Sequence, residues 1–127
     1  MTPVVLDAGA LIALERGARR TGALLAAVEG EEGALLVPAP VLAQVWCGGG
    51  PRQRLLSRAL VRPEVEIVGL DELLAMAAGL LLARSGTQDI TDAAVCAVAH
   101  TRGARVVISS NPDDIGRLAP RLRVLVP

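Results

Sequence analysis

Short aliphatic runs separated by longer helical segments are the feature that most constrains the fold of this chain. The runs are nearly continuous in Val, Leu and Ile, which is typical of strands buried on both faces of a parallel sheet. Strands are predicted at residues 4–6, 34–37, 65–68, 105–109 and 122–126. Because these strands alternate with helices, we predict a three-layer α/β/α fold with a central, mostly parallel sheet, in one domain over residues 1–127.

Helix signals fill the intervals between the predicted strands. Asp71 and Asp89 stand where N-caps are expected, and Gly30 and Gly103 stand where helices end. Helices are predicted at residues 9–15, 20–29, 40–47, 51–60, 71–83, 89–103 and 112–118.

Composition excludes several classes of function. The 127 residues carry 13 acidic and 13 basic side chains, so bulk charge does not predict nucleic-acid binding. Every basic residue is Arg, which excludes a catalytic Lys. Trp46 is the only aromatic residue; it is expected to be a core or interface anchor, and base stacking is not expected to be a major binding mode. Cys47 and Cys96 are expected to be buried thiols.

No signal peptide or membrane span is predicted. The first residues lack a basic region followed by a long apolar stretch, and the longest apolar run, 73–83, is too short to cross a bilayer. A soluble cytoplasmic protein is therefore expected.

Carboxylate and amide side chains follow several of the predicted strands. Ligand sites in open α/β sheets form at the carboxyl ends of the strands, so side chains from distant segments should meet there. The candidates are Asp7, Gln44, Asp89, Asp92, Asn111, Asp113 and Asp114. A group of acids with no Lys to neutralise it requires a cation, and oxygen ligands favour Mg²⁺ or Mn²⁺.

Helix capping offers a purely structural explanation for some of these residues. Asp89 can cap the helix that follows it, and Asn111, Pro112 and two acids would make a good helix start without any function. Capping explains Asp92 less well, because Asp92 begins a helix that must face the core. Asp7 has no cap or surface pair evident in the sequence, which favours a functional role. His100 is expected to be a surface or packing residue.

Four segments together resemble a known family. They read VVLDAGALIALE, PAPVLAQVW, TQDITDAAVCAVA and RVVISSNPDDI, and in order and spacing they resemble the PIN domain, more narrowly the VapC group of toxins from toxin–antitoxin pairs. The resemblance implies a Mg²⁺- or Mn²⁺-dependent endoribonuclease in which Asp7, Asp92 and Asp89 hold the metal and support catalysis. It also implies an RNA substrate, a small cognate antitoxin and a homodimer.

Two positions depart from the family pattern. Gln44 stands where the second motif usually has Glu, and Asn111 where the fourth usually has Asp, while Asp114 could take over part of that role. Amides bring carbonyl oxygen but no charge, so the metal should bind more weakly. An inactive PIN-like module that only binds RNA or a protein is therefore the alternative prediction.

Other classes fit the sequence less well. Receiver domains and haloacid-dehalogenase-type phosphatases also place an Asp after the first strand, but both rely on a Lys, and the phosphatase needs a second Asp where this chain has Gly9. The triple glycine at 48–50 lacks the Lys of a Walker phosphate loop. For RNA recognition, Arg52, Arg54 and Arg58 are weak candidates.

Overall fold

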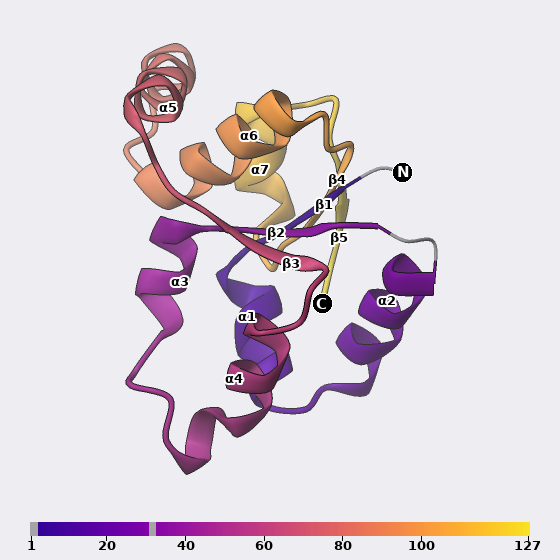
Figure 1. The fold of residues 1–127 in the computed structure, drawn as a ribbon. Coiled ribbons are helices and arrows are strands. Elements are labelled where there is room, and N and C mark those ends of the chain that lie inside the picture. The colour runs from indigo at the N-terminus through magenta and orange to yellow at the C-terminus, as the bar shows by residue number, and fades with distance from the viewer. Residues whose placement is uncertain (1–2, 31–32) are drawn as a thin grey trace.

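The computed structural model describes residues 3–30 and 33–127, and these form a five-stranded sheet between two layers of helices (Figure 1). The strands are β1 (Val4–Leu6), β2 (Leu35–Pro38), β3 (Val65–Val68), β4 (Val106–Ile108) and β5 (Arg123–Leu125). They lie in the order β3-β2-β1-β4-β5, and all four pairings are parallel. The predicted α/β/α architecture is confirmed.

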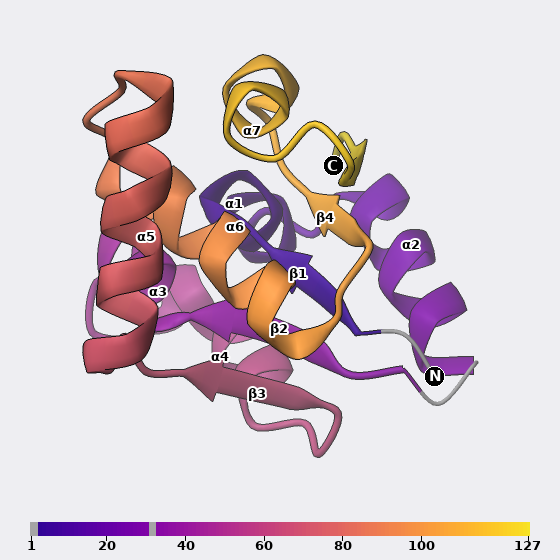
Figure 2. The ribbon, with the colours of Figure 1, turned by 90° about the horizontal axis from the view of Figure 1, so that it is seen from above.

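Helices cover both faces of this sheet. They are α1 (Ala8–Glu15), α2 (Arg19–Gly30), α3 (Ala39–Val45), α4 (Arg54–Leu60), α5 (Glu72–Ser85), α6 (Ile90–Arg102) and α7 (Pro112–Leu118), with a 3₁₀ turn, η1, at Pro51–Gln53. Figure 1 shows α5, α6 and α7 on one side of the sheet and α1, α2 and α4 on the other. In the view from above, α6 crosses over β1 and β2, which it contacts (Figure 2).

Strand burial follows position in the sheet. All residues of β1 and β2 are buried, as the continuous aliphatic runs predicted. The outer strand β3 differs, because Glu66 and Ile67 are exposed. An edge strand has a neighbour on one side only, so the helix layers cover it less completely than the inner strands.

The segment after β2 departs from the prediction at Trp46 and Cys47. The helix was expected to reach Cys47, but α3 ends at Val45. The backbone N–H of Cys47 donates instead to Oε1 of Gln53, at 2.8 Å, which ends the helical hydrogen-bond series. Trp46 is 43% exposed, which contradicts a core anchor but leaves the interface anchor untested. The expectation that Cys47 is buried was wrong, because it is exposed. Cys96 is buried, and both cysteines are free, as predicted.

Helix caps agree with the sequence at most positions. Oδ1 of Asp71 accepts from the N–H of Leu74, and Gly103 ends α6 in the left-handed region. His100 is exposed, as expected. Within residues 3–30 and 33–127, no helix combines the length and the apolar character needed to cross a bilayer.

Candidate functional site

Asp7 lies at the carboxyl end of β1, buried between two chain segments that are far apart in sequence. It is 2% exposed, and its Oδ2 accepts a hydrogen bond of 2.7 Å from the hydroxyl of Ser109. Its Oδ1 accepts from the N–H of Ala8 at the start of α1. The expectation that Asp7 has no cap to make was therefore wrong, because its carboxylate caps α1. One carboxylate oxygen therefore accepts a hydrogen bond from the start of α1, and the other accepts one from the residue that follows β4.

Ser109 was not identified from the sequence. The parallel register places Leu6 opposite Ile108, so the residues that follow the two strands, Asp7 and Ser109, become neighbours. Ser109 is fully buried, and its Oγ also accepts from the N–H of Asn111 at 3.0 Å. The signal that could have revealed it was its position directly after a strand, which is the same position that singled out Asp7.

The start of α6 contributes a second pair of acids. Asp89 is exposed and its Oδ1 accepts from the N–H of Asp92 at 3.0 Å, which confirms the predicted cap. Asp92 is only 5% exposed, as its apolar surroundings suggested. Burial, together with the negative charges of Asp89, Asp7 and Asp114 and a hydrogen bond with Asp89, raises the pKa of Asp92 to about 7.

Asp92 thus interacts with three other carboxylates, Asp7, Asp89 and Asp114, and the four come from three segments of the chain. Cys96 follows Asp92 by one helical turn, and burial raises its pKa to about 12, with Asp92 and Asp7 adding to the shift. Cys96 consequently stays a neutral thiol at physiological pH, which excludes it as a nucleophile. The chemistry available at this site is that of carboxylate oxygens.

The two amide residues, Gln44 and Asn111, are less clearly part of this site than the acids. Gln44 is exposed on α3 and takes no part in the hydrogen bonds that link Asp7 to Ser109 or Asp89 to Asp92. Asn111 occupies the N-cap position of α7, but its side chain makes no capping hydrogen bond, so the predicted cap is wrong for its side chain. Asp113 and Asp114 lie exposed in the first turn of α7, and Asp114 acts on Asp92 through its charge.

The donor set fits a hard divalent cation in its chemistry, because buried acids with no positive partner need one and oxygen ligands suit Mg²⁺ or Mn²⁺. Among residues 3–30 and 33–127, however, no three His, Cys, Asp or Glu side chains are grouped closely enough to hold a metal. Asp89 and Asp114 are exposed, so either could turn toward an ion without losing core packing.

The arginines proposed for RNA recognition lie elsewhere. Arg52, Arg54 and Arg58 are exposed on η1 and α4, beyond the C-terminal end of α1, whereas Asp7 caps its N-terminal end. The side chain of Gln53 donates to Glu15, the last residue of α1, at 2.6 Å. Eight residues of helix, roughly 12 Å, therefore separate these arginines from the acids.

Gly9 permits the close approach of α1 to the segment after β4. A Cβ atom at residue 9 would lie 2.4 Å from Oγ of Ser110 and 2.7 Å from its Cβ. We expect Gly9→Ala to lower the free energy of unfolding by about 1–3 kcal/mol, because α1 or residue 110 must move. Urea denaturation tests this. Gly79→Ala on α5, where a Cβ would meet nothing within 4 Å, is the control and should be neutral or stabilising. A free energy of unfolding that rises by a similar amount in both variants would contradict the prediction.

Comparisons with known proteins agree with the fold. A family model described as the PIN domain matches residues 4–119. The structure of VapBC2 from Rickettsia felis bound to a promoter DNA fragment is similar, with a TM-score of 0.76 at 16% identity and 99% coverage of each chain.

Two further structures also resemble the fold. DNA-bound VapBC from Salmonella typhimurium matches with a TM-score of 0.72 at 17% identity, covering 99% of this chain and 98% of that one. VapC20 of Mycobacterium tuberculosis, described as a sarcin–ricin loop cleaving toxin, matches with a TM-score of 0.64 at 16% identity. The match covers 87% of this chain and 92% of that one. No curated protein sequence matches the chain.

Proposed function

This chain belongs to the PIN domain family, and from that premise we propose that it is a Mg²⁺- or Mn²⁺-dependent endoribonuclease, the toxin of a toxin–antitoxin pair. The observation that carries the proposal is Asp92, which is buried and surrounded by the negative charges of Asp7, Asp89 and Asp114. A core carboxylate in that position is costly unless a cation compensates its charge. We treat residues 1–127 as one catalytic domain that acts in the cytoplasm.

Asp7, Asp92 and Asp89 are the residues we assign to the metal, with Gln44, Asn111 and Asp114 as possible supporting residues. When bound, the ion would stabilise the charge that develops on an RNA phosphate and make an attacking water more acidic. The chain itself prepares the ligands. Ser109 and the N–H of Ala8 orient the two oxygens of Asp7, and Asp89 caps the start of α6 through the backbone N–H of Asp92. Without a cation, Asp92 keeps its proton over much of the range below pH 7.

Cleavage of RNA is expected only when Mg²⁺ or Mn²⁺ is added, and a chelator should stop it. A fluorescent RNA incubated with the purified protein over a series of metal concentrations tests this. The alternative, an inactive module that binds RNA or a protein, is favoured by the exposed Gln44 and by the absence of three grouped ligands among the described residues. RNA that stays intact at every metal concentration would support that alternative and overturn the enzymatic proposal.

An antitoxin partner is supported by the VapBC structures among the similar folds. A homodimer is supported by α5, which buries Leu74 and Ala78 but exposes an apolar stripe of Leu73, Met76 and Leu80. Residues spaced by three and four positions share one helix face, so these three side chains form a continuous surface.

Met76→Arg should convert the dimer into a monomer, because a guanidinium would be buried against apolar side chains without a partner. Light scattering after size-exclusion chromatography gives the mass. Val61→Arg, at an exposed apolar residue outside α5, is the control and should leave the dimer intact. A wild-type protein that runs as a monomer, or a Met76→Arg variant that stays dimeric, would refute this interface.

A further inference from the structure

The loop after α3 is held in one conformation by the side chain of Gln53. Gln53 is 3% exposed, and its Oε1 accepts from the N–H groups of Cys47 and Gly49, at 2.8 and 3.1 Å. Its Nε2 donates to the carbonyl oxygen of Val45 and to the carboxylate of Glu15, at 2.8 and 2.6 Å. One buried amide thus links the ends of α1 and α3 to the loop that follows α3.

This loop displays the only aromatic side chain of the protein. Trp46 is 43% exposed, and its ring lies beside Gly49, whose φ is +87° and where a Cβ atom would lie 3.0 Å from the ring. A larger residue at position 49 would both strain the backbone and push the ring aside. An exposed aromatic on a fixed loop loses the free energy that burial would provide, which is typical of aromatics that serve binding.

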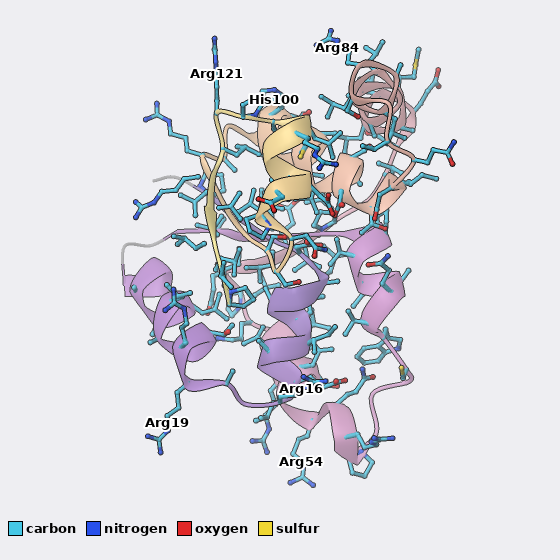
Figure 3. All side chains as sticks on the ribbon, turned by 180° about the vertical axis from the view of Figure 1, so that it is seen from behind. Arg16, Arg19, Arg54, Arg84, His100 and Arg121 are labelled. Carbon is cyan, nitrogen blue, oxygen red and sulfur yellow. The ribbon has the colours of Figure 1, made fainter. Side chains whose placement is uncertain are left out.

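Arginines gather at the same end of the molecule. Residues 15–20 and 51–64 contain seven of the 13 arginines but only two of the 13 acids, so the neutral chain is strongly polarised. Figure 3 shows Arg16, Arg19 and Arg54 at one end and Arg84 and Arg121 at the other. Arg16 follows Glu15, and Arg52 and Arg54 flank Gln53, so the hydrogen bond from Gln53 to Glu15 brings the backbone segments that carry these three arginines to the same end of the molecule.

We infer that Trp46, Arg16, Arg52 and Arg54 form an RNA-binding surface, here called the Trp46 surface, on which one unpaired base stacks on the indole while the guanidinium groups contact the adjacent phosphates. The identity of the ligand as RNA rests on the proposed function. Three exposed arginines at the end of the molecule that also exposes the indole can supply the phosphate contacts and the stacking platform that single-stranded RNA requires. Trp and Arg also anchor protein interfaces, so an acidic polypeptide is the competing ligand in the test below.

The Trp46 surface lies close enough to the acids for one RNA strand to reach both. It stands at the C-terminal end of α1, roughly 12 Å from Asp7 at the N-terminal end, a distance that a few nucleotides span. Trp46 also follows α3, which packs beside α1 and carries Gln44. The surface would therefore position the strand a fixed number of nucleotides from the bond to be cut.

The intrinsic fluorescence of the protein reports on this surface directly, since Trp46 is the only fluorophore of its kind. Titration with a single-stranded RNA of about twelve nucleotides, with a chelator present to prevent cleavage, should quench Trp46. A labelled form of the same RNA gives the affinity of each variant by anisotropy. Trp46→Leu should bind at least about fivefold more weakly, the lower end of the effect of losing one stacked base.

Charge variants separate phosphate contacts from stacking. In the double variant Arg52→Gln, Arg54→Gln, the slope of log affinity against log salt should become shallower by about 0.7 for each arginine removed. The control is Arg84→Gln, Arg121→Gln, which removes the same charge from the opposite end and should leave the slope unchanged. Circular dichroism of each variant establishes that it is folded.

The outcomes separate this inference from the proposed function. If the protein cleaves RNA but RNA does not quench Trp46, or both double variants behave alike, the Trp46 surface is refuted and the nuclease stands. If RNA is never cut but quenching and the salt effect are present, the surface stands and the nuclease proposal fails. Quenching by an acidic polypeptide that equals quenching by RNA would assign the surface to a protein partner and overturn the inference.

Discussion

Asp7→Asn is expected to reduce metal-dependent RNA cleavage by at least about 100-fold, because even residues that only orient metal ligands contribute roughly 10- to 100-fold. The variant removes one negative charge from the group around Asp92 while keeping the shape of the side chain. An amide can preserve both hydrogen bonds of Asp7: its oxygen accepts from Ala8, and its nitrogen can donate to the hydroxyl of Ser109. The fold should therefore survive, so that lost activity reports on the charge.

The measurement is the initial rate of cleavage at saturating metal, repeated at a tenfold higher metal concentration. Asp113→Asn is the matched control, because Asp113 is an exposed acid in the first turn of α7 that does not act on Asp92. It should cleave at close to the wild-type rate. An Asp7→Asn variant that retains activity within a few-fold of the wild type would remove Asp7 from the metal site.

Asp92→Asn is expected to stabilise the metal-free protein at neutral and alkaline pH while it abolishes cleavage. The pKa of Asp92 is about 7 in the folded protein, against an ordinary value of 3.8. Between these values the folded state binds more protons than the unfolded chain, so the free energy of unfolding falls as the pH rises from about 4 to 7 and stays low above. This decrease in the free energy of unfolding is at most about 4 kcal/mol, since each unit of pKa corresponds to about 1.4 kcal/mol.

Asparagine at position 92 does not titrate, so its contribution to the free energy of unfolding should stay the same between about pH 4 and pH 7. Urea denaturation at pH 5 and pH 8 in the presence of a chelator measures the difference. Added Mg²⁺ should restore stability to the wild type at pH 8 but not to Asp92→Asn, because a ligand stabilises only the state that binds it. Asp113→Asn should keep the wild-type pH dependence. Equal stability of the wild type at pH 5 and pH 8 would contradict the prediction.

Local patterns in the sequence predicted most of the fold. The inner strands are buried where the aliphatic runs lie, and Asp71, Asp89 and Gly103 begin or end helices as their types favour. Periodicity and capping depend on residues within a turn or two, so they can be read directly along the chain. The rule that sites form at the carboxyl ends of parallel strands placed Asp7 at that edge, and the start of the helix that carries Asp92 was expected to reach it.

Contacts between distant residues were decided only by the tertiary structure. Ser109 reaches Asp7 across 102 positions because β1 and β4 pair in one register, and no local pattern encodes that register. Gln53 ends α3 early and leaves Trp46 exposed, although the residues of α3 alone favour a longer helix. Composition and periodicity set which segments become strands and helices, since those preferences are local. Which polar side chains face one another depends on how the completed layers pack, and that determined the surroundings of both Asp92 and Trp46.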